Sequence, residues 1–366
     1  MRRYNCTFFL VAMLLLGMVL GVNSLVDTYW YFGTTNLLST CKFNFDERVQ
    51  KTNLLLNMPP RYDALLLGSS RVSFMPPALF RGSTLFNYSL GSMYPDEYEE
   101  CVAAARLRHP VRTIYIGMDF YGTATHKMFP ADNPVRKNVE GAQNPLRKLG
   151  ALLSWDGLLY AFRTARMSLG GGISSDYYDK DYVKHMAPYS REQQPDVILA
   201  QLRLYHEKAY GPGYQWNGAL PELYRRLRQQ NPDVEFVVFT TPISAPMFSL
   251  LVRDGRLHDY ERWLRLIVEN FGSVQDFMGL NSVTENLDNY ADAHHYLPPV
   301  GEYIVDRLEG RNTQAPADFG VRVTSRNLDE HLAQIRLLTQ RTDPDPFGTW
   351  EAKAKVPAGS AKPTAD

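Results

Sequence analysis

The chain has 366 residues, of which 45% are hydrophobic and 21% are charged, so it can bury a substantial core and is not broadly disordered. Its 39 lysines and arginines balance its 39 aspartates and glutamates, and no basic block stands out, which excludes the usual electrostatic signature of a nucleic-acid-binding protein. Its three cysteines form no CxxC pair, which excludes a zinc ribbon and a disulfide-dense secreted scaffold.

An apolar stretch at the N-terminus indicates where the protein works. It follows Arg2 and Arg3 and runs for 16 residues, from 7 to 22, which lies between the ~7–15 residues of a signal-peptide core and the ~20 residues of a membrane span. Leu25 and Val26 extend the stretch, and the basic residues before it predict a cytoplasmic N-terminus. We therefore predict that residues 1–26 are a signal anchor or a signal peptide.

Export affects how the cysteines are interpreted. Cys6 precedes the apolar stretch, whereas Cys41 and Cys101 would lie in an oxidising compartment. A disulfide between Cys41 and Cys101 is permitted there. The alternative is that both are small buried side chains, as free cysteines commonly are.

Three short apolar segments in the first third of the chain have the character of buried parallel strands. These strands are predicted at residues 64–67, 84–88 and 113–116, with a helix over 95–108 between the last two. The helix begins with proline and acidic residues and ends with arginines, as the helix dipole prefers. Continuous apolar strands of this kind predict a parallel sheet that is covered on both faces.

The rest of the chain continues the alternation of helices and strands. Helices are predicted over about 195–210, 220–230, 260–271 and 298–308, and strands over 234–239 and 274–277. Residues 27–63 show no sustained periodicity and are predicted to be a linker. Residues 309–366 are predicted to contain a C-terminal helix over 325–340, followed from Asp343 onward by a disordered tail.

Polar motifs follow the predicted strands or lie in loops, where open α/β sheets place their ligands. A serine nucleophile needs a base within hydrogen-bond reach and a group that orients this base. Ser70 supplies a hydroxyl, and Asp292 and His295, three positions apart, can share one turn. Taken alone, the serine is typical of a turn or helix N-cap and the Asp-x-x-His of a surface turn or metal ligands, but their order favours a nucleophile with its base. Ser69 and His294 are the alternative nucleophile and base.

The order of these motifs resembles that of the SGNH/GDSL hydrolase superfamily over residues 64–308. Gly68-Ser69-Ser70 is similar to the first block of the family, and Asp292 with His295 is similar to the last. The resemblance implies that Ser70 is the nucleophile and that His295, oriented by Asp292, is its base. It also implies that the backbone N–H of Ser70 and that of Gly91, which matches the second block, form the oxyanion hole.

The third block departs from the family. The family has Gly-x-Asn, whereas this chain has Gly117-Met118-Asp119, so Asp119 stands at the position of a further oxyanion-hole donor. An ionised aspartate there would repel an oxyanion. Asp119 is therefore protonated, or it points elsewhere, or this oxyanion hole uses fewer donors.

The resemblance also implies a fold. This is an α/β three-layer sandwich around a central, mostly parallel sheet of the SGNH or flavodoxin-like type, preceded by one N-terminal membrane helix. The domain would cover residues 64–308 with an insertion over about 122–195. The linker at 27–63 would precede it and the segment 309–366 would follow it.

Within the superfamily, the chain is most similar to exported, membrane-anchored members that modify bacterial cell-surface polymers. The likeness rests on Leu-Leu-Gly-Ser-Ser-Arg, Ile-Gly-Met-Asp-Phe and the ending His-His-Tyr-x-Pro-x-x-Gly. It implies an O-acyltransferase or esterase, anchored in the bacterial inner membrane with a periplasmic domain. The enzyme would act through an acyl-serine on a cell-surface polysaccharide or exopolysaccharide, beside a membrane-bound O-acyltransferase.

The alternative is a catalytically inactive SGNH-like module that binds a glycan or docks onto a membrane-bound acyltransferase. Asp119 in place of asparagine favours this second interpretation. We expect no cofactor and no metal, and His185 and His206 have no partners at metal-ligand spacing.

A tyrosine-rich segment offers candidate substrate-binding residues. Tyr177, Tyr178 and Trp216 could form a platform on which sugar rings stack, since flat aromatic rings suit the apolar faces of pyranoses. The alternative is that these aromatic side chains make a local core.

Overall fold

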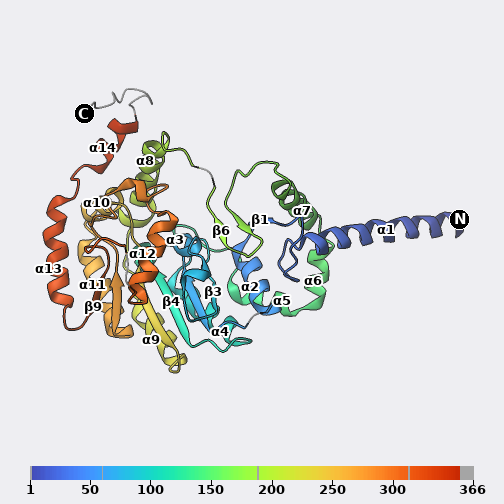
Figure 1. Ribbon diagram of the computed structural model, residues 1–366, viewed down its shortest axis with the longest axis horizontal. Coiled ribbons are helices and arrows are strands. Elements are labelled where there is room, and N and C mark those ends of the chain that lie inside the picture. The colour runs from blue at the N-terminus through green and yellow to red at the C-terminus, as the bar shows by residue number, and fades with distance from the viewer. Residues whose placement is uncertain (1, 60, 188, 312–313, 355–366) are drawn as a thin grey trace. The chain divides into compact units, whose positions relative to one another are not determined.

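The computed structural model describes residues 2–59, 61–187, 189–311 and 314–354, drawn in Figure 1. The chain divides into two compact units. Unit 1 comprises Met1–Tyr62, Glu99–Pro110 and Ala131–Pro188, and unit 2 comprises Asp63–Tyr98, Val111–Pro130 and Tyr189–Asp366.

Unit 1 contains the N-terminal helix, a small sheet and a group of helices. Its elements are α1 (Arg2–Val26), β1 (Cys41–Phe43), α2 (Glu47–Asn57), most of α4 (Tyr98–Arg106), α5 (Val135–Gln143), α6 (Pro145–Leu152), α7 (Trp155–Ser168), β5 (Tyr177–Asp179) and β6 (Lys184–His185). The three strands are antiparallel in the order β1-β5-β6. All three cysteines are free, and Cys101 is buried.

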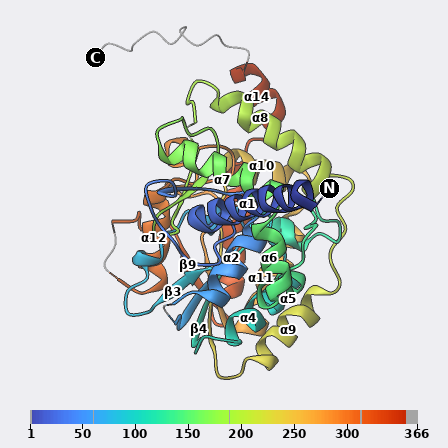
Figure 2. The ribbon, with the colours of Figure 1, turned by 90° about the vertical axis from the view of Figure 1, so that its right-hand side faces the viewer.

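The helix α1 confirms the predicted apolar N-terminal helix. Between Tyr4 and Val26 it is long and apolar enough to cross a membrane, and a signal sequence would have the same properties. Its large apolar side chains from Tyr4 to Met18 are exposed, whereas Asn23 and Val26 are buried. The C-terminal end of α1 therefore packs against the rest of unit 1, where Figures 1 and 2 place α6 and α7 beside it.

The expected linker at 27–63 is a folded part of unit 1. It contributes β1, which pairs with β5, and α2, which packs on α5. These partners come from the segment expected to be an insertion, so both segments contribute to unit 1. The sequence gives little sign of α2 because its buried residues include polar ones, such as Gln50 and Asn53, which hide the hydrophobic period of a helix.

A buried ion pair joins α2 to the small sheet. The Nζ of Lys184 lies 2.8 Å from Oε1 of Glu47, and the hydroxyl of Tyr178 donates to the same oxygen at 2.6 Å. Burial alone would raise the pKa of Glu47, but Lys184 and Lys51 lower it to about 2. The carboxylate therefore stays charged at neutral pH.

Unit 2 is an α/β structure around a six-stranded sheet. Its strands are β2 (Ala64–Gly68), β3 (Leu85–Asn87), β4 (Thr113–Met118), β7 (Glu235–Thr240), β8 (Ser273–Asp276) and β9 (Val321–Thr324). Its α-helices are α3 (Ser70–Ser73), α8 (Gln194–Tyr205), α9 (Leu220–Gln230), α10 (Ala245–Arg253), α11 (Leu257–Phe271), α12 (Pro298–Leu308), α13 (Leu328–Leu338) and α14 (Pro346–Ala354). Short 3-10 helices cover Pro77–Leu79, Pro95–Glu97, Phe120–Thr123, Leu287–Asn289 and Thr339–Arg341, and a π-helical turn covers His206–Tyr210.

The order of the strands sets the topological switch point of the sheet beside β2. The sheet runs β3-β2-β4-β7-β8-β9, and all neighbouring pairs are parallel except β8 with β9. Counted along unit 2, the five parallel strands have the order 2-1-3-4-5, which is the flavodoxin-like doubly wound order. In that order the chain reverses direction across the sheet between β2 and β4, and ligands bind outside the carboxyl ends of the strands at this point.

Helices cover both faces of this sheet. On one face, Ile304 of α12 belongs to a buried core with Leu66 of β2 and Phe239 of β7. On the other face, the ring of Phe271 in α11 lies 5.6 Å from that of Phe236, which is three residues from Phe239 and so points to the opposite side of β7. The sheet is therefore the middle of three layers, as expected for the α/β class.

The C-terminal segment extends the sheet beyond the expected end of the domain at 308. The strand β9 pairs antiparallel with β8, and α14 buries Trp350 and packs on α8. A four-residue edge strand with exposed side chains, such as that of Val321, carries too weak a period to be predicted. The expected tail begins at Asp343, but α14 lies within it, and residues 355–366 lie outside the described residues.

Candidate active site

The turn that carries Ser70 leaves the sheet at the carboxyl end of β2. Gly68 has φ +146°, and a Cβ atom there would lie 2.6 Å from the carbonyl oxygen of Gly117 in β4. Only glycine fits where the two strands come this close. The side chain of Ser69 then caps α3 by accepting the N–H of Arg71, and Ser70 is the first residue of that helix.

Ser70, His295 and Asp292 form a continuous hydrogen-bonded row. The Oγ of Ser70 lies 2.9 Å from Nε2 of His295, and Nδ1 of His295 lies 2.7 Å from Oδ2 of Asp292. When Nδ1 carries the ring proton and donates a hydrogen bond to the carboxylate, Nε2 has a lone pair that can accept the hydroxyl proton of Ser70. The structure therefore brings Ser70 together with Asp292 and His295, which lie more than 220 residues further along the chain.

The backbone holds Asp292 in place. Its Oδ1 accepts the N–H of His294 at 2.8 Å and the N–H of His295 at 2.7 Å. Burial alone would raise the pKa of Asp292, but the two imidazoles and these hydrogen bonds lower it well below its usual range. Asp292 is therefore an anion at neutral pH, and it can stabilise an imidazolium at His295.

The alternative nucleophile and base are placed differently. Ser69 is 1% exposed and is used as the cap of α3. The ring of His294 packs against those of Tyr205, at 5.2 Å, and His295, at 4.2 Å, and its Nδ1 lies 3.8 Å from Oδ1 of Asp292. Burial and the neighbouring His295 lower the pKa of His294 well below its usual value, so this ring is neutral at pH 7.

Asp119 points into a buried polar cluster behind the nucleophile. Its Oδ1 accepts a hydrogen bond from Nη1 of Arg71 at 2.9 Å and another from the hydroxyl of Thr241. Nη2 of Arg71 donates to the hydroxyl of Tyr205 at 3.1 Å. Burial alone would lower the pKa of Arg71, but Asp119 raises it well above its ordinary value.

Because Asp119 is paired with Arg71, it does not act as the oxyanion-hole donor that its place in the third motif would imply. A carboxylate paired with a guanidinium accepts hydrogen bonds and has no proton to give to an oxyanion. Asp119 instead neutralises Arg71, which directly follows Ser70 in α3 and is 1% exposed. The sequence left three alternatives for Asp119. The structure supports the one in which its side chain points elsewhere, toward Arg71.

Arg71, Tyr205 and Thr241 were not predicted as site residues. Arg71 was visible as the last residue of the first motif. Thr241 lies 170 residues away from it in the chain, and Tyr205 lies 134 residues away, so no local spacing could have connected them. Tyr205 comes just before the π-helical turn, a feature that is frequent at functional sites.

The loop that carries Gly91 is attached to the turn that carries Ser70. The N–H of Leu90 donates to the carbonyl of Gly68 at 2.9 Å, and Nδ2 of Asn87 donates to the carbonyl of Val72 in α3 at 3.0 Å. Gly91 follows this anchored segment directly and is half-buried. Its loop therefore lies at the same edge of the sheet as Ser70, where the carboxyl ends of β2 and β3 meet.

The aromatic residues considered for substrate binding come from both units, and each has partners within its own unit. Tyr178 is 1% exposed and donates its hydroxyl to Glu47, so its ring is not available for stacking. Tyr177, which also belongs to unit 1, stacks on His185. Trp216 belongs to unit 2, where the guanidinium of Arg262 lies 4.3 Å from its ring centroid. The burial of Tyr178 thus agrees with the alternative of a local core.

The residues of this site include potential metal ligands. The ligand atoms of Asp292, His294 and His295 lie within 4.8 Å of one another, close enough to share a cation. However, the nitrogens of His295 are the same ones that contact Asp292 and Ser70. A cation there would have to displace the hydrogen bonds of the row.

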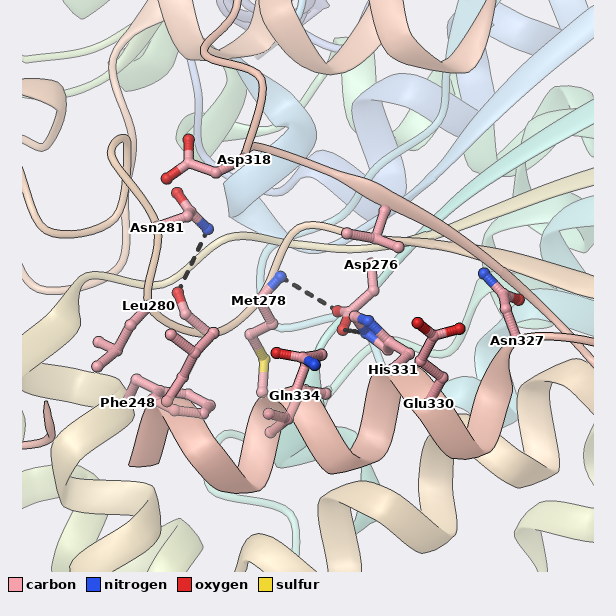
Figure 3. A pocket seen from close by; sticks show the side chains of 14 residues that line it. Phe248, Asp276, Met278, Leu280, Asn281, Asp318, Asn327, Glu330, His331 and Gln334 are labelled. Carbon is pink, nitrogen blue, oxygen red and sulfur yellow. Dashed lines mark hydrogen bonds and ion pairs between the residues drawn. The ribbon is translucent and has the colours of Figure 1, made fainter. Parts of the chain in front are cut away.

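A separate cavity of about 320 Å³ lies between β8 and α13 and contains a second histidine–carboxylate pair (Figure 3). Nε2 of His331 lies 2.7 Å from Oδ2 of Asp276. Asp276 also accepts hydrogen bonds from the hydroxyls of Tyr260 and Thr240 and from the N–H of Met278. The carboxylate is therefore saturated by its neighbours, and none of the described residues that line the cavity is a serine.

No protein-family model matches this chain, and no curated protein matches it. Among solved structures, the chain is similar to that of a candidate platelet activating factor from Streptococcus pneumonia, with 10% identity and a TM-score of 0.35, covering 72% of this chain and 89% of that one. A likeness at this score carries no argument about fold or function. The interpretation of the site therefore rests on its own geometry.

Proposed function

We propose that this protein is an exported serine-dependent acyl ester hydrolase or O-acyltransferase of the SGNH type, acting on a bacterial cell-surface polysaccharide or exopolysaccharide. One observation carries the proposal: Ser70, His295 and Asp292 are joined by hydrogen bonds of 2.9 and 2.7 Å. The motif order of the SGNH/GDSL superfamily supports the choice of ester chemistry.

The reaction follows from this row. His295 takes the proton of Ser70 as the serine oxygen attacks the ester carbonyl, and Asp292 stabilises the imidazolium that forms. When the tetrahedral intermediate collapses, the bond to the alcohol oxygen breaks, and His295 gives its proton to this oxygen. Water, or a sugar hydroxyl in a transferase, then attacks the acyl-serine with His295 again as base.

The backbone N–H groups of Ser70 and Gly91 are the proposed oxyanion hole. Loss of one such donor costs roughly 3 kcal/mol of transition-state stabilisation, or about 10²–10³ in kcat. Because Asp119 is bound to Arg71, this hole would use fewer side-chain donors than the family pattern implies. The backbone donors therefore carry more of the stabilisation.

The proposed location depends on α1. As a retained anchor it would hold the protein in the bacterial inner membrane, with Arg2 and Arg3 on the cytoplasmic side and both units in the periplasm. An acylated glycan there is the proposed substrate, and a membrane-bound O-acyltransferase is the proposed partner.

Hydrolysis of a chromogenic acetyl ester tests the activity. Ser70→Ala is expected to lower kcat by at least ~10³-fold, because the nucleophile is lost. Ser190→Ala, which changes an exposed serine, is the matched control and is expected to leave kcat unchanged. Equal turnover by wild type and Ser70→Ala would contradict the proposal.

A specific observation favours one second candidate, a catalytically inactive glycan-binding or docking module. The family position for an asparagine donor holds Asp119, which is committed to Arg71. This candidate predicts binding of an acylated polysaccharide with no ester cleavage by the wild-type chain.

A further inference from the structure

Helices α6 and α7 expose an apolar face. Five of their large apolar side chains are exposed, and together they define the α6–α7 face: Leu146 78%, Leu149 45%, Trp155 69%, Leu159 45% and Phe162 68%. The last three lie at i, i+4 and i+7, so they share one side of α7. The buried residues of α7 are small or polar, namely Gly157, Ala161 and Thr164. The helix thus turns its largest apolar side chains outward.

The α6–α7 face lies beside the C-terminal end of α1, where this helix packs on the rest of unit 1. The buried side chain of Asn23 donates through Nδ2 to the carbonyls of Leu152 at 2.8 Å and Ser154 at 3.3 Å. These two carbonyls are at the end of α6 and just before α7. Figures 1 and 2 show α6 and α7 on either side of the C-terminal end of α1.

The length of α1 indicates where this junction lies relative to the bilayer. Tyr4, the first residue of the segment that could cross a membrane, and Asn23 are 19 residues apart in one continuous helix. At 1.5 Å per residue this distance is about 29 Å, which matches the ~30 Å hydrocarbon core of a bilayer. A span that begins at Tyr4 therefore ends where Asn23 binds the α6–α7 junction.

The charges around this face suit a lipid surface. Between 145 and 168 the basic side chains are Arg147, Lys148, Arg163 and Arg166, against the single acidic side chain of Asp156. Basic residues at the edge of an apolar stripe attract anionic headgroups and keep their charge in water while their stems lie on apolar surface. Trp155 adds the aromatic residue that is enriched at membrane interfaces.

We infer that the α6–α7 face lies in the outer interfacial layer of the membrane that α1 crosses, with its apolar side chains among the acyl chains next to anionic headgroups. The inference goes beyond the proposed reaction and rests on α1 being retained as an anchor. Unit 1 would then contact the bilayer both through α1 and through a helix surface lying in the interface. A second copy of the chain or a membrane-protein partner is a competing occupant of this face.

Fluorescence quenching by lipid tests the inference on the full chain. Cysteine is placed at Leu159 or Phe162, in a background with Cys6→Ala and Cys41→Ala, and is labelled with an environment-sensitive fluorophore. Cys101 is buried and stays unlabelled. The proteins are reconstituted into vesicles of phosphatidylethanolamine and phosphatidylglycerol, with and without nitroxide-labelled lipid. Leu337→Cys on α13, where the native side chain is 56% exposed, is the matched control.

The inference expects blue-shifted emission and several-fold stronger nitroxide quenching at 159 and 162 than at 337. It also expects weaker quenching when phosphatidylcholine replaces the anionic lipid. Unquenched probes at 159 and 162 in vesicles that carry the full chain would overturn it. Blue-shifted emission at 159 and 162 in native membranes, without such a shift in lipid vesicles, would assign the face to a protein partner. This result would also overturn the inference. Flotation of the chain and ester hydrolysis, measured on the same samples, report separately on the anchor and on the proposed reaction.

Discussion

At the scale of single residues, the position of the Asp292 charge is the feature on which the proposed chemistry depends. The carboxylate receives two backbone N–H groups on one oxygen and the imidazole on the other. This arrangement fixes both the orientation and the tautomer of His295, because a carboxylate can only accept a hydrogen bond from Nδ1.

The first prediction concerns this tautomer. Asp292→Asn can turn its NH₂ group toward Nδ1 and so place the imidazole proton on Nε2, where it blocks acceptance of the Ser70 proton. We expect kcat for ester hydrolysis to fall by about 10⁴-fold, as for the equivalent change in serine proteases, while the protein stays folded. Steady-state kinetics and circular dichroism check this, and kcat within tenfold of wild type would be incompatible with a role for Asp292 in orienting His295.

The second prediction concerns the buried ion pair behind the nucleophile. Asp119→Ala leaves the Arg71 guanidinium buried without its counter-charge, and such a loss typically costs about 3–5 kcal/mol of unfolding free energy. Urea denaturation in detergent measures the change. The double variant Arg71→Met/Asp119→Leu, which removes both charges, is the control and is expected to be less destabilised than Asp119→Ala. Wild-type stability of Asp119→Ala would show that the pair is not needed.

At the scale of elements, α2 is held to the small sheet by charge as well as by packing. The pKa of Glu47 is about 2, against an ordinary value of 4.5, because Lys184 and Lys51 outweigh the effect of burial. A depressed carboxyl pKa contributes stability that is fully present above the ordinary value. This stability is lost as the pH falls toward 2.

The third prediction follows from this sign. Between pH 4.5 and pH 2 the wild-type chain is expected to lose about 3 kcal/mol of unfolding free energy through Glu47 alone. Glu47→Gln removes this titration, so its stability curve is expected to start lower at pH 7 and to be flatter in acid. Urea midpoints measured from pH 7 to pH 2 compare the two chains, and parallel curves would contradict the assignment.

The elements also show how far a sequence can predict this fold. The strands β2, β4 and β7 are continuous apolar runs, and each was predicted within one or two residues. The strands that were not predicted, β1, β5, β6 and β9, have only two to four residues, too few for a period to be visible. The helix α2 was missed because it buries charged and polar side chains, among them Glu47, whose partners Tyr178 and Lys184 are more than 120 residues away.

At the scale of the whole molecule, the sequence located the candidate nucleophile, base and carboxylate but not their surroundings. The order of the motifs was enough for Ser70, Asp292 and His295, because each lies at a strand end or in a short turn. The partner of Asp119 could not be predicted, since a buried charge finds its counter-charge only in the folded chain. The division into two units was also hidden, because unit 1 is assembled from three separated segments.

The fourth prediction concerns α1. If it is a retained anchor, the full chain remains in the membrane fraction after alkaline carbonate extraction, and added protease digests both units in spheroplasts but not in intact cells. Release of the chain into the soluble periplasmic fraction, with a new N-terminus near residue 25, would identify α1 as a cleaved signal sequence. Mass spectrometry of the N-terminal peptide distinguishes the two outcomes.

The most direct test of the central claim is to map the adduct formed by a fluorophosphonate, which reacts with serines activated by a neighbouring base. The account predicts a single phosphonyl group on the peptide that contains Ser70. It predicts that this adduct is lost in His295→Ala and retained in His294→Ala. An adduct on another residue, or no adduct on the folded wild-type chain, would contradict the claim that His295 and Asp292 make Ser70 a nucleophile.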